Sequence, residues 1–362
     1  MNLLIDSRMI SCSGIGTVIK NLISPLSSFP FCTNLILPPN DARLQNTANI
    51  PCDASIYSLA EQFVLPKLIP SCDLFWSPHY NIPVLPIKAK KRIVTIHDAY
   101  HLRFKGSLGW KEKLYAQCMF RQAVYRSDAV ITDSQFSQQE LSSLLSIPPS
   151  RIHVIYPGVD YERFSRKCRK ETLEMIKQKY ALPDCFLLFV GNLKSHKNLQ
   201  LILDAYEKFS IEIPLVILGK KNGLRHVDPA LIRIEQTPKL KNQIHQTGEV
   251  LDEELPAFYQ MAFALIFPSL YEGFGLPPLE AMASGCPAIV SRKASLPEVC
   301  EDAACFIDSN DAGELADAIQ KIQTDAVYRS LLQEKGNSRA QHFSWEKTAH
   351  QYRKLFQEIY FR

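Results

Sequence analysis

The chain has 362 residues, more than one hydrophobic core usually supports, so its length predicts two domains. Hydrophobic residues make up 46% of the chain, charged residues 22% and aromatic residues 10%. This composition is typical of globular proteins and excludes disordered, collagen-like and coiled-coil chains. The formal net charge of +4 is small and argues against a dedicated nucleic-acid-binding protein, so no nucleic-acid partner is expected.

The positive charge is concentrated in one segment. Residues 1–160 contain 15 basic and 11 acidic side chains, whereas residues 161–362 contain 26 of each. Residues 88–126 contain ten basic residues and only Asp98 and Glu112 as acids, a local charge of +8. Aromatic residues lie between these basic ones, a pattern that suits an anionic membrane surface or a lipid-diphosphate acceptor. Peripheral membrane contact through residues 88–126 is one interpretation, and a solvated basic face is the other.

The ten cysteines include no C-x-x-C pair, and disulfide scaffolds belong mainly to short secreted chains. Reduced thiols and a cytoplasmic location are therefore expected. The first residues, MNLLIDSRMI, reach Asp6 and Arg8 before an apolar run of signal-peptide length forms. The longest apolar runs, such as residues 261–267, are too short to span a bilayer, so any membrane association is expected to be peripheral.

Short apolar runs alternate with helical patterns in the first part of the chain. The expected strands are residues 3–5, 34–37, 74–76, 93–96, 129–131 and 153–155. The expected helices are residues 17–24, 108–125 and 135–145. Continuous apolar strands that alternate with helices indicate a parallel sheet covered on both faces.

A turn signal, Tyr-Pro-Gly-Val-Asp at residues 156–160, separates the two parts, and the polar segment 163–170 is the expected linker. The pattern then restarts, with expected strands at 186–190, 215–218, 244–247, 264–267 and 288–290. The expected helices are 198–209, 252–261, 277–283, 311–323, 325–342 and 345–360. The sequence thus predicts two α/β, Rossmann-like domains over residues 1–160 and 161–344. The last three helices are more than the second sheet requires, so one of them is expected to cross back to the first domain.

The most informative segment is residues 267–282, FPSLYEGFGLPPLEAM, which combines a buried strand end, a glycine loop and a helix opened by two prolines. Gly273 and Gly275 allow the backbone to approach a ligand, and free N–H groups at a helix start favour an anion. Glu272 precedes the helix and Glu280 lies inside it, so the two carboxylates are placed to flank one ligand with vicinal hydroxyls, such as a sugar or a ribose. The alternative is an ordinary loop with two solvated glutamates.

The run from Glu272 to Glu280, EGFGLPPLE, followed by AMASGCPAIVS, resembles the E-x7-E motif of the retaining glycosyltransferases of family 4. The resemblance implies the GT-B fold, in which two Rossmann-like domains face each other across a cleft. It implies that Glu272 contacts the donor sugar at the catalytic centre and that Glu280 binds the nucleotide ribose. It also implies that the backbone of Phe274, Gly275 and Leu276 holds sugar and phosphate oxygens of the donor.

A second match lies at residues 191–198, GNLKSHKN, which resembles the family's G-x-x-x-x-[RH]-K-N segment. A basic residue between a strand and a helix N-terminus suits a diphosphate, because its charge and the helix dipole act together. The resemblance implies that Lys197 binds the donor diphosphate. His196 stands where many members carry arginine, so the charge that it contributes is expected to depend on pH. A solvated surface lysine is the alternative for Lys197.

The first domain carries weaker signals. The segment SGIGT, with Gly14 and Gly16, is a poor dinucleotide fingerprint and disfavours a dehydrogenase, but it resembles a family loop that lies over the donor diphosphate. A plain turn is the alternative. His97 follows an expected strand where the family has a histidine near the reaction centre, so it is expected to bind a sugar hydroxyl or stabilise charge. Asp98 is expected to orient that loop, and His79 fits either an acceptor site or packing.

Two further segments resemble the family. Residues 154–160, VIYPGVD, match its interdomain connection, and residues 343–348, FSWEKT, match the start of its last helix. In the family this helix returns to the first domain, so residues 345–362 are assigned to that domain.

The resemblance is strongest to members that transfer mannose from GDP-mannose in surface polysaccharide assembly. It implies a glycan or lipid-linked acceptor, transfer by same-face attack and no cofactor. The chain contains no Asp-x-Asp signature, in keeping with a metal-independent enzyme. UDP- or dTDP-hexose donors remain alternatives. A sugar-nucleotide epimerase and a non-catalytic carbohydrate-binding relative are the rival classes.

Overall fold

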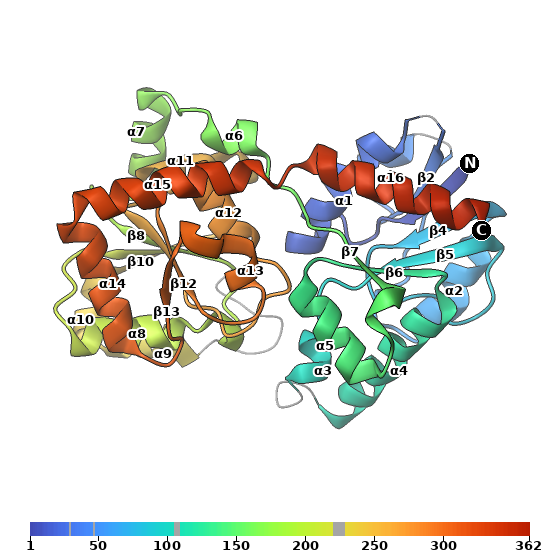
Figure 1. Ribbon diagram of the computed structural model, residues 1–362, viewed down its shortest axis with the longest axis horizontal. Coiled ribbons are helices and arrows are strands. Elements are labelled where there is room, and N and C mark those ends of the chain that lie inside the picture. Colours follow the sequence, from blue (N-terminus) through green and yellow to red (C-terminus); the bar gives the residue numbers. More distant parts are fainter. Residues whose placement is uncertain (29, 46–47, 105–108, 220–228) are drawn as a thin grey trace. The chain divides into compact units, whose positions relative to one another are not determined.

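The computed structural model describes residues 1–28, 30–45, 48–104, 109–219 and 229–362 (Figure 1). The chain forms two compact units: unit 1 comprises Met1–Gly158 and Trp345–Arg362, and unit 2 comprises Val159–Ser344. The prediction of a linker at residues 163–170 is wrong, because this segment belongs to unit 2 and overlaps two of its helices. Asp160 caps the first of them through the Arg163 N–H (3.1 Å), which lets the helix begin directly after the turn.

Unit 1 contains, within the described residues, a seven-stranded parallel sheet in the order β3-β2-β1-β4-β5-β6-β7. Its strands are β1 (Asn2–Asp6), β2 (Cys32–Leu37), β3 (Ile50–Pro51), β4 (Cys72–Ser77), β5 (Ala89–Thr95), β6 (Ala129–Thr132) and β7 (Ile152–Val154). The six expected strands are confirmed. Strand β3 escapes a sequence pattern because it has only two residues at the sheet edge.

The helices of unit 1 include one from the far end of the chain. They are α1 (Ser13–Leu26), η1 (Ala42–Gln45), α2 (Glu61–Leu68), α3 (Tyr100–Arg103), α4 (Trp110–Arg126), α5 (Gln135–Leu145), η3 (Pro149–Arg151) and α16 (Trp345–Phe361). In α16, the buried Tyr352 and Phe356 pack on Trp76 of β4, with ring centroids 5.2 and 5.8 Å apart. Figure 1 shows α16 beside α1. The expected return of the last helix to the first domain is confirmed.

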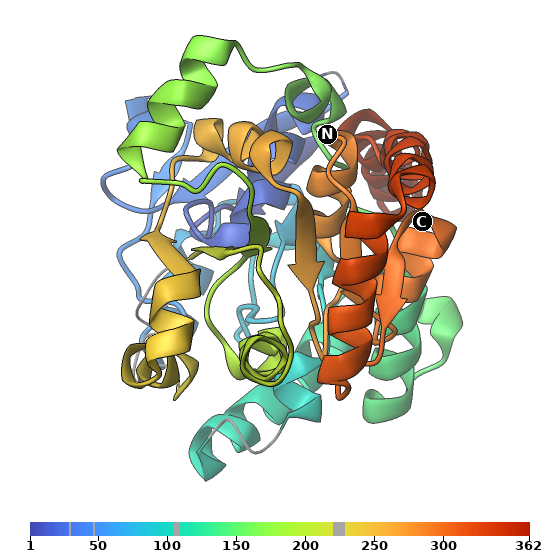
Figure 2. The same ribbon diagram turned by 90° about the vertical axis from the view of Figure 1, so that its left-hand side faces the viewer.

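Unit 2 has, in the part of it that the structure describes, a six-stranded parallel sheet in the order β10-β9-β8-β11-β12-β13. Its strands are β8 (Leu187–Val190), β9 (Leu215–Leu218), β10 (Ile244–Gly248), β11 (Ala264–Phe267), β12 (Ala288–Ser291) and β13 (Cys305–Ile307). All four residues of β11, ALIF, have no exposed surface. A strand that is apolar at every position is stable only where both sheet faces are covered, and Figure 2 shows helices around this sheet.

The helices of unit 2 follow its strands. They are α6 (Tyr161–Ser165), α7 (Lys170–Lys179), η4 (Ser195–Lys197), α8 (Leu199–Lys208), α9 (Pro229–Gln236), α10 (Pro238–Gln243), η5 (Asp252–Glu254), α11 (Leu255–Met261), α12 (Leu276–Ala283), α13 (Leu296–Cys300), η6 (Glu301–Ala303), α14 (Ala312–Thr324) and α15 (Ala326–Gln341).

Each sheet has a point at which the winding direction reverses. In unit 1 this point lies between β1 and β4, and in unit 2 it lies between β8 and β11. Loops that follow two such neighbouring strands diverge to opposite sides of the sheet and leave a crevice at the carboxyl ends, where doubly wound folds bind ligands. The strand order therefore locates one candidate site in each unit.

Candidate active site

The reversal point of unit 2 brings together two residues predicted from separate motifs. Lys197 lies on η4 after β8, and Glu272 lies in the loop after β11. Lys197 Nζ donates to Glu272 Oε1 at 2.6 Å, and the two side chains are only 15% and 13% exposed. Lys197 Nζ also lies 4.9 Å from the centroid of the Phe267 ring. The structure thus places a shielded cation and a carboxylate at the expected ligand position.

Asn198 joins the two loops that carry this pair. Its backbone is left-handed (φ 60°), and its side-chain amide donates to the carbonyl oxygens of Pro268 (3.2 Å) and Ser309 (2.7 Å). The Leu270 N–H donates to the carbonyl oxygen of His196 at 2.7 Å. Because backbone contacts fix both loops, Lys197 and Glu272 do not depend on each other alone for their positions.

The loop between Glu272 and α12 is held by the buried Ser295. Its Oγ lies 3.0 Å from the carbonyl oxygen of Glu272 and 2.6 Å from that of Phe274, and shares its hydrogen with them. Gly275 has φ 118° and serves as the N-cap position of α12, whose first residue is Leu276. A Cβ at Gly275 would lie 2.9 Å from a methyl carbon of Leu296. This position therefore needs glycine both for its backbone conformation and for space.

Glu280, the second predicted carboxylate, lies within α12 and has its own partner. Tyr259 of α11 donates its hydroxyl hydrogen to Glu280 Oε2 at 2.8 Å. Burial raises the pKa of Glu280 above its usual value, and the hydrogen bond from Tyr259 opposes that rise. The spacing of the E-x7-E motif contains no signal for Tyr259, which lies on another helix.

In unit 1, His97 follows β5 and is mostly buried between two acceptors. Its Nδ1 lies 2.7 Å from Asp133 Oδ2, and its Nε2 lies 3.1 Å from the carbonyl oxygen of Pro78. A carbonyl oxygen and an ionised carboxylate can only accept, so this geometry favours the form of the ring in which both nitrogens donate. Burial alone would lower the pKa of His97, but the Asp133 carboxylate raises it above its usual value. Both N–H groups are occupied, so this geometry favours charge stabilisation over a hydrogen bond to a sugar.

The two predicted glycines of unit 1 lie in a helix and not in a loop. Helix α1 begins at Ser13, so the expectation of a G-I-G loop is wrong. A Cβ at Gly16 would overlap the carbonyl group of Ile10, whereas a Cβ at Gly14 would meet no atom within 4 Å. Gly16 therefore serves close packing within unit 1. The donor contact that the resemblance implies for both glycines stays a prediction.

The reversal point of unit 1 holds a buried ionic network. Arg8 Nε and Nη2 donate to both carboxylate oxygens of Asp6 (2.8 and 2.7 Å), and Nη2 also donates to Glu61 Oε1 at 2.5 Å. The Arg8 and Glu61 side chains are 4% and 0% exposed. Glu61 Oε2 accepts from Asn81 Nδ2 at 2.5 Å and from the Tyr57 N–H at 2.9 Å. The carboxylates already engage the Arg8 guanidinium, so this network is structural.

His79, for which acceptor binding and packing were both open, is neutral and bonds to Asn81 and Tyr57, which also belong to that network. Its Nδ1 accepts from the Asn81 N–H (3.1 Å), so its Nε2 carries the hydrogen and donates to the Tyr57 hydroxyl (2.9 Å). Burial, with nearby cations, lowers the pKa of His79 to about 3. The geometry therefore fits a packing role.

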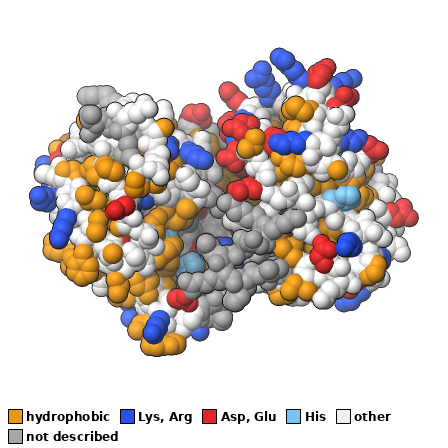
Figure 3. All heavy atoms as spheres, turned by 180° about the vertical axis from the view of Figure 1, so that it is seen from behind, with side chains coloured by type: hydrophobic (Ala, Val, Ile, Leu, Met, Phe, Trp, Pro, Cys, Tyr) orange, Lys and Arg blue, Asp and Glu red, His pale blue; other side chains and the backbone are white. Residues whose placement is uncertain are grey.

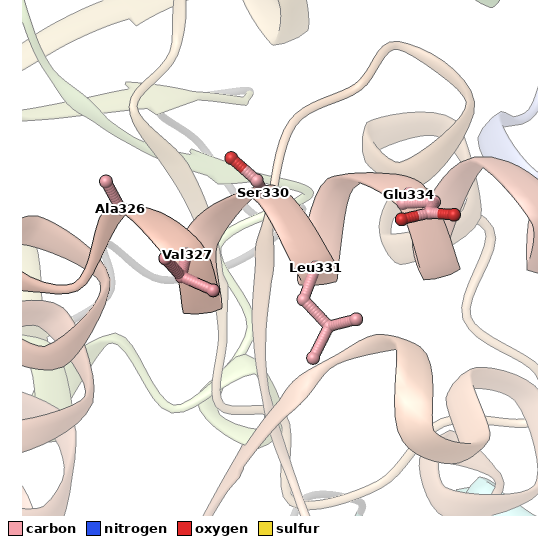
Figure 4. Close-up of a pocket in the computed structure, with 5 residues that line it drawn as sticks. All are labelled: Ala326, Val327, Ser330, Leu331 and Glu334. Atoms are coloured by element: carbon pink, nitrogen blue, oxygen red, sulfur yellow. The ribbon is translucent and has the colours of Figure 1, made fainter.

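A surface hollow of about 430 Å³ lies apart from these residues. It is lined by Ala326, Val327, Ser330, Leu331 and Glu334, all from α15 of unit 2 (Figure 4). None of them belongs to a predicted motif, and all five are exposed. This hollow is not a candidate for the active site.

Two family models match the chain. The model described as "Glycosyl transferases group 1" matches residues 173–352, and the model described as "Glycosyltransferase Family 4" matches residues 30–163. Residues 173–352 include the whole of both motifs that carry Lys197, Glu272 and Glu280.

Among proteins of known function, the chain is similar to O-antigen chain mannosyltransferase B of Escherichia coli. The two are 30% identical over 268 residues, which span 72% of this chain and 69% of that protein. The serotype-specific mannosyltransferase WbdA of Escherichia coli is 31% identical over 62% of this chain, but the match spans only 28% of WbdA. Among solved structures, HepE of Anabaena in complex with UDP-glucose superposes with a TM-score of 0.80 at 17% identity, covering 99% of this chain and 100% of that chain.

Proposed function

Since the chain belongs to glycosyltransferase family 4 and has the GT-B fold, we propose that it transfers a hexose with retention of anomeric configuration. The proposed donor is a nucleoside-diphosphate sugar, with GDP-mannose first. The proposed acceptor is a glycan or a lipid-linked glycan in cell-surface polysaccharide synthesis. The similarity to O-antigen mannosyltransferases supports mannose, and the UDP-glucose in the similar HepE structure keeps a UDP-hexose as the second candidate.

The observation that carries this proposal is the Lys197–Glu272 pair at the reversal point of unit 2, with Glu280 on the helix that follows. In the proposed reaction, Lys197 and His196 stabilise the negative charge that develops on the leaving diphosphate. Backbone N–H groups near Gly275 and Leu276 assist them. Such fixed charges and dipoles are effective catalysts because they need no reorganisation when the bond breaks.

Glu272 has a second task in this scheme. Its carboxylate pairs with Lys197 Nζ at 2.6 Å, and the donor diphosphate competes for the same ammonium group. Glu272 is then released toward the hydroxyls of the donor sugar. His97 is proposed to take part in catalysis by stabilising charge, and unit 1 is proposed to bind the acceptor. No step in this scheme uses a metal ion or a cofactor.

The donor is tested by a screen of nucleotide release. We expect purified protein, with a mannan-type or lipid-linked acceptor, to release nucleoside diphosphate fastest from GDP-mannose among GDP-, UDP- and dTDP-hexoses. Release is expected to persist in EDTA. Fastest release from a UDP-hexose would overturn the donor assignment but leave the enzyme class. Release that does not depend on acceptor would contradict transfer itself.

Helix α4 carries an exposed apolar stripe within the basic segment 88–126. Trp110, Leu114 and Tyr125 are 71%, 62% and 62% exposed. Their spacing places them on one face of the helix, and the ammonium group of Lys111 lies 5.4 Å from the Trp110 ring centroid. Lys105, part of the predicted basic segment, lies outside the described residues.

We propose that this stripe rests on an anionic membrane surface, on the cytoplasmic side, where a lipid-linked acceptor would be reached. Exposed aromatic and aliphatic side chains beside lysine and arginine suit the interface between acyl chains and headgroups. Figure 3 shows hydrophobic side chains gathered on the surface of unit 1 (left). No helix within the described ranges has the length and apolar character needed to cross a bilayer.

A Trp110→Ser/Leu114→Ser variant should sediment with phosphatidylglycerol-containing vesicles at least tenfold more weakly than the unmodified protein, since each buried side chain contributes about 1.5–3 kcal/mol. The matched control is Val327→Ser/Leu331→Ser, an exposed pair at the same spacing on α15 of unit 2 (80% and 42% exposed), which should bind normally. Equal vesicle binding by both variants would remove α4 from the membrane proposal.

A further inference from the structure

A buried hydroxyl–carboxylate contact connects α11 to the proposed ribose-binding residue. The Tyr259 hydroxyl donates to Glu280 Oε2 at 2.8 Å, and Tyr259 has no exposed surface. A residue with no exposed surface does not itself meet a ligand. Its influence on the site can only act through the carboxylate that it binds.

Packing fixes the direction of this hydroxyl. The Tyr259 ring makes an edge-to-face contact with the buried Phe164 of α6, with centroids 5.8 Å apart and ring planes at 67°. Tyrosine has only two side-chain torsions, so a fully packed ring leaves its oxygen a single position. Glutamate has more side-chain torsions, so a hydrogen bond to one of its oxygens is needed to fix the orientation of its carboxylate.

We infer that Tyr259 is a positioning residue for Glu280, and that its hydroxyl holds the carboxylate in the orientation that receives the ribose hydroxyls of the nucleotide donor. This inference rests on the proposed function, because it takes Glu280 as the ribose ligand. It adds a residue on another helix, 21 positions before Glu280 in the sequence, that the E-x7-E pattern does not contain.

The same bond helps to keep Glu280 charged. Burial favours the protonated acid and raises the pKa of Glu280, whereas the Tyr259 hydroxyl lowers it. The charged groups that act on Glu280 from other elements are Arg163 of α6, which lowers its pKa, and Asp252 of η5, which raises it. Loss of the hydroxyl therefore raises the pKa of Glu280. On acidification, nucleotide binding that needs the charged carboxylate is then lost at a higher pH than in the unmodified protein.

The experiment compares a ribonucleotide with its 2′-deoxy form. Affinities for GDP and 2′-deoxy-GDP are measured by calorimetry for the unmodified protein and for Tyr259→Phe, or for UDP and 2′-deoxy-UDP if the donor screen selects uridine nucleotides. Loss of a hydrogen bond to a charged group corresponds to roughly a tenfold to hundredfold change. We expect Tyr259→Phe to weaken GDP by that factor and to weaken 2′-deoxy-GDP much less, so that discrimination between them falls. As the pH is lowered, the GDP affinity of Tyr259→Phe should begin to fall at a higher pH than that of the unmodified protein.

Tyr206→Phe is the matched control, because Tyr206 is equally buried in unit 2 and its hydroxyl donates to the Ile213 carbonyl oxygen at 2.6 Å. It should lower thermal stability without changing discrimination. If Tyr259→Phe leaves the ratio of the two affinities unchanged, the positioning role is overturned, whether or not overall binding weakens. Glu280→Ala separates the two proposals: if it leaves GDP affinity unchanged, the proposed donor site itself fails.

Discussion

A Lys197→Met variant is expected to lose about a hundredfold to a thousandfold in kcat/KM with the preferred donor. The Lys197 side chain is 15% exposed, and its Nζ lies 2.6 Å from Glu272 Oε1. Methionine keeps the unbranched stem that passes the Phe267 ring but removes the charge that would stabilise the leaving diphosphate. The Glu272 carboxylate would then be left without its cation where the diphosphate must bind. KM should therefore rise and kcat should fall.

Lys194→Met is the matched control for this prediction. Lys194 lies in the same loop before η4 and is exposed, so its loss should change kcat/KM less than about twofold. A Lys197→Arg variant keeps the charge and should retain more turnover than Lys197→Met. The measurement is the steady-state kcat and KM for the donor, at saturating acceptor, in each variant and in the unmodified protein. Half or more of normal turnover in Lys197→Met, in a protein with an unchanged thermal transition, would remove Lys197 from the mechanism.

The candidate donor site of unit 2 is the part of the molecule for which the sequence carries the most signal. Lys197 and Glu272 lie in the segments that follow β8 and β11, and both strands are apolar at every position. A local pattern therefore marks both the strand and the residue at its end. What local pattern cannot supply is the sheet order, and it is the pairing of β8 with β11 that places Lys197 beside Glu272.

Partners drawn from other elements were not predictable. Asp133 follows β6 and meets His97 because β5 and β6 are neighbours, and Tyr259 meets Glu280 because two helices pack together. Neither residue type nor spacing marks these contacts. The start of α1 was missed for a different reason: its N-cap residue, Cys12, makes no side-chain capping bond, and two glycines in the first turns have low helix propensity. Packing against the Ile10 backbone outweighs that local preference at Gly16.

The second large effect concerns stability, and it should arise from the buried network of unit 1. Arg8→Met is expected to lower the free energy of unfolding by about 3–5 kcal/mol, the usual cost of removing one partner from a buried charge pair. Arg8 is 4% exposed, and its loss would leave the carboxylates of Asp6 and Glu61 facing each other without a cation. Burial disfavours a charged guanidinium, but these two carboxylates outweigh it and raise the pKa of Arg8.

The chain contains a matched control with the same local geometry. Arg43 donates to both oxygens of Asp41, also two positions earlier, at 2.7 and 2.6 Å, but its side chain is 43% exposed. Arg43→Met should therefore cost less than about 1 kcal/mol, because water replaces the lost interaction. All three tryptophans, Trp76, Trp110 and Trp345, belong to unit 1, so urea unfolding followed by tryptophan fluorescence reports on the unit that contains both arginines.

The effect of a second substitution on stability distinguishes loss of charge pairing from simple loss of packing. If Arg8→Met is destabilising because it leaves two buried carboxylates, then adding Glu61→Gln should restore part of the stability. The defect should also shrink as the pH falls: the folded-state pKa of Glu61 is already raised by burial, and removing Arg8 raises it further, so protonation relieves the repulsion on acidification. Simple loss of packing predicts an additive Glu61→Gln and a defect that does not vary with pH. A cost no larger than that of Arg43→Met would show that the network does not hold the carboxyl end of β1 in place.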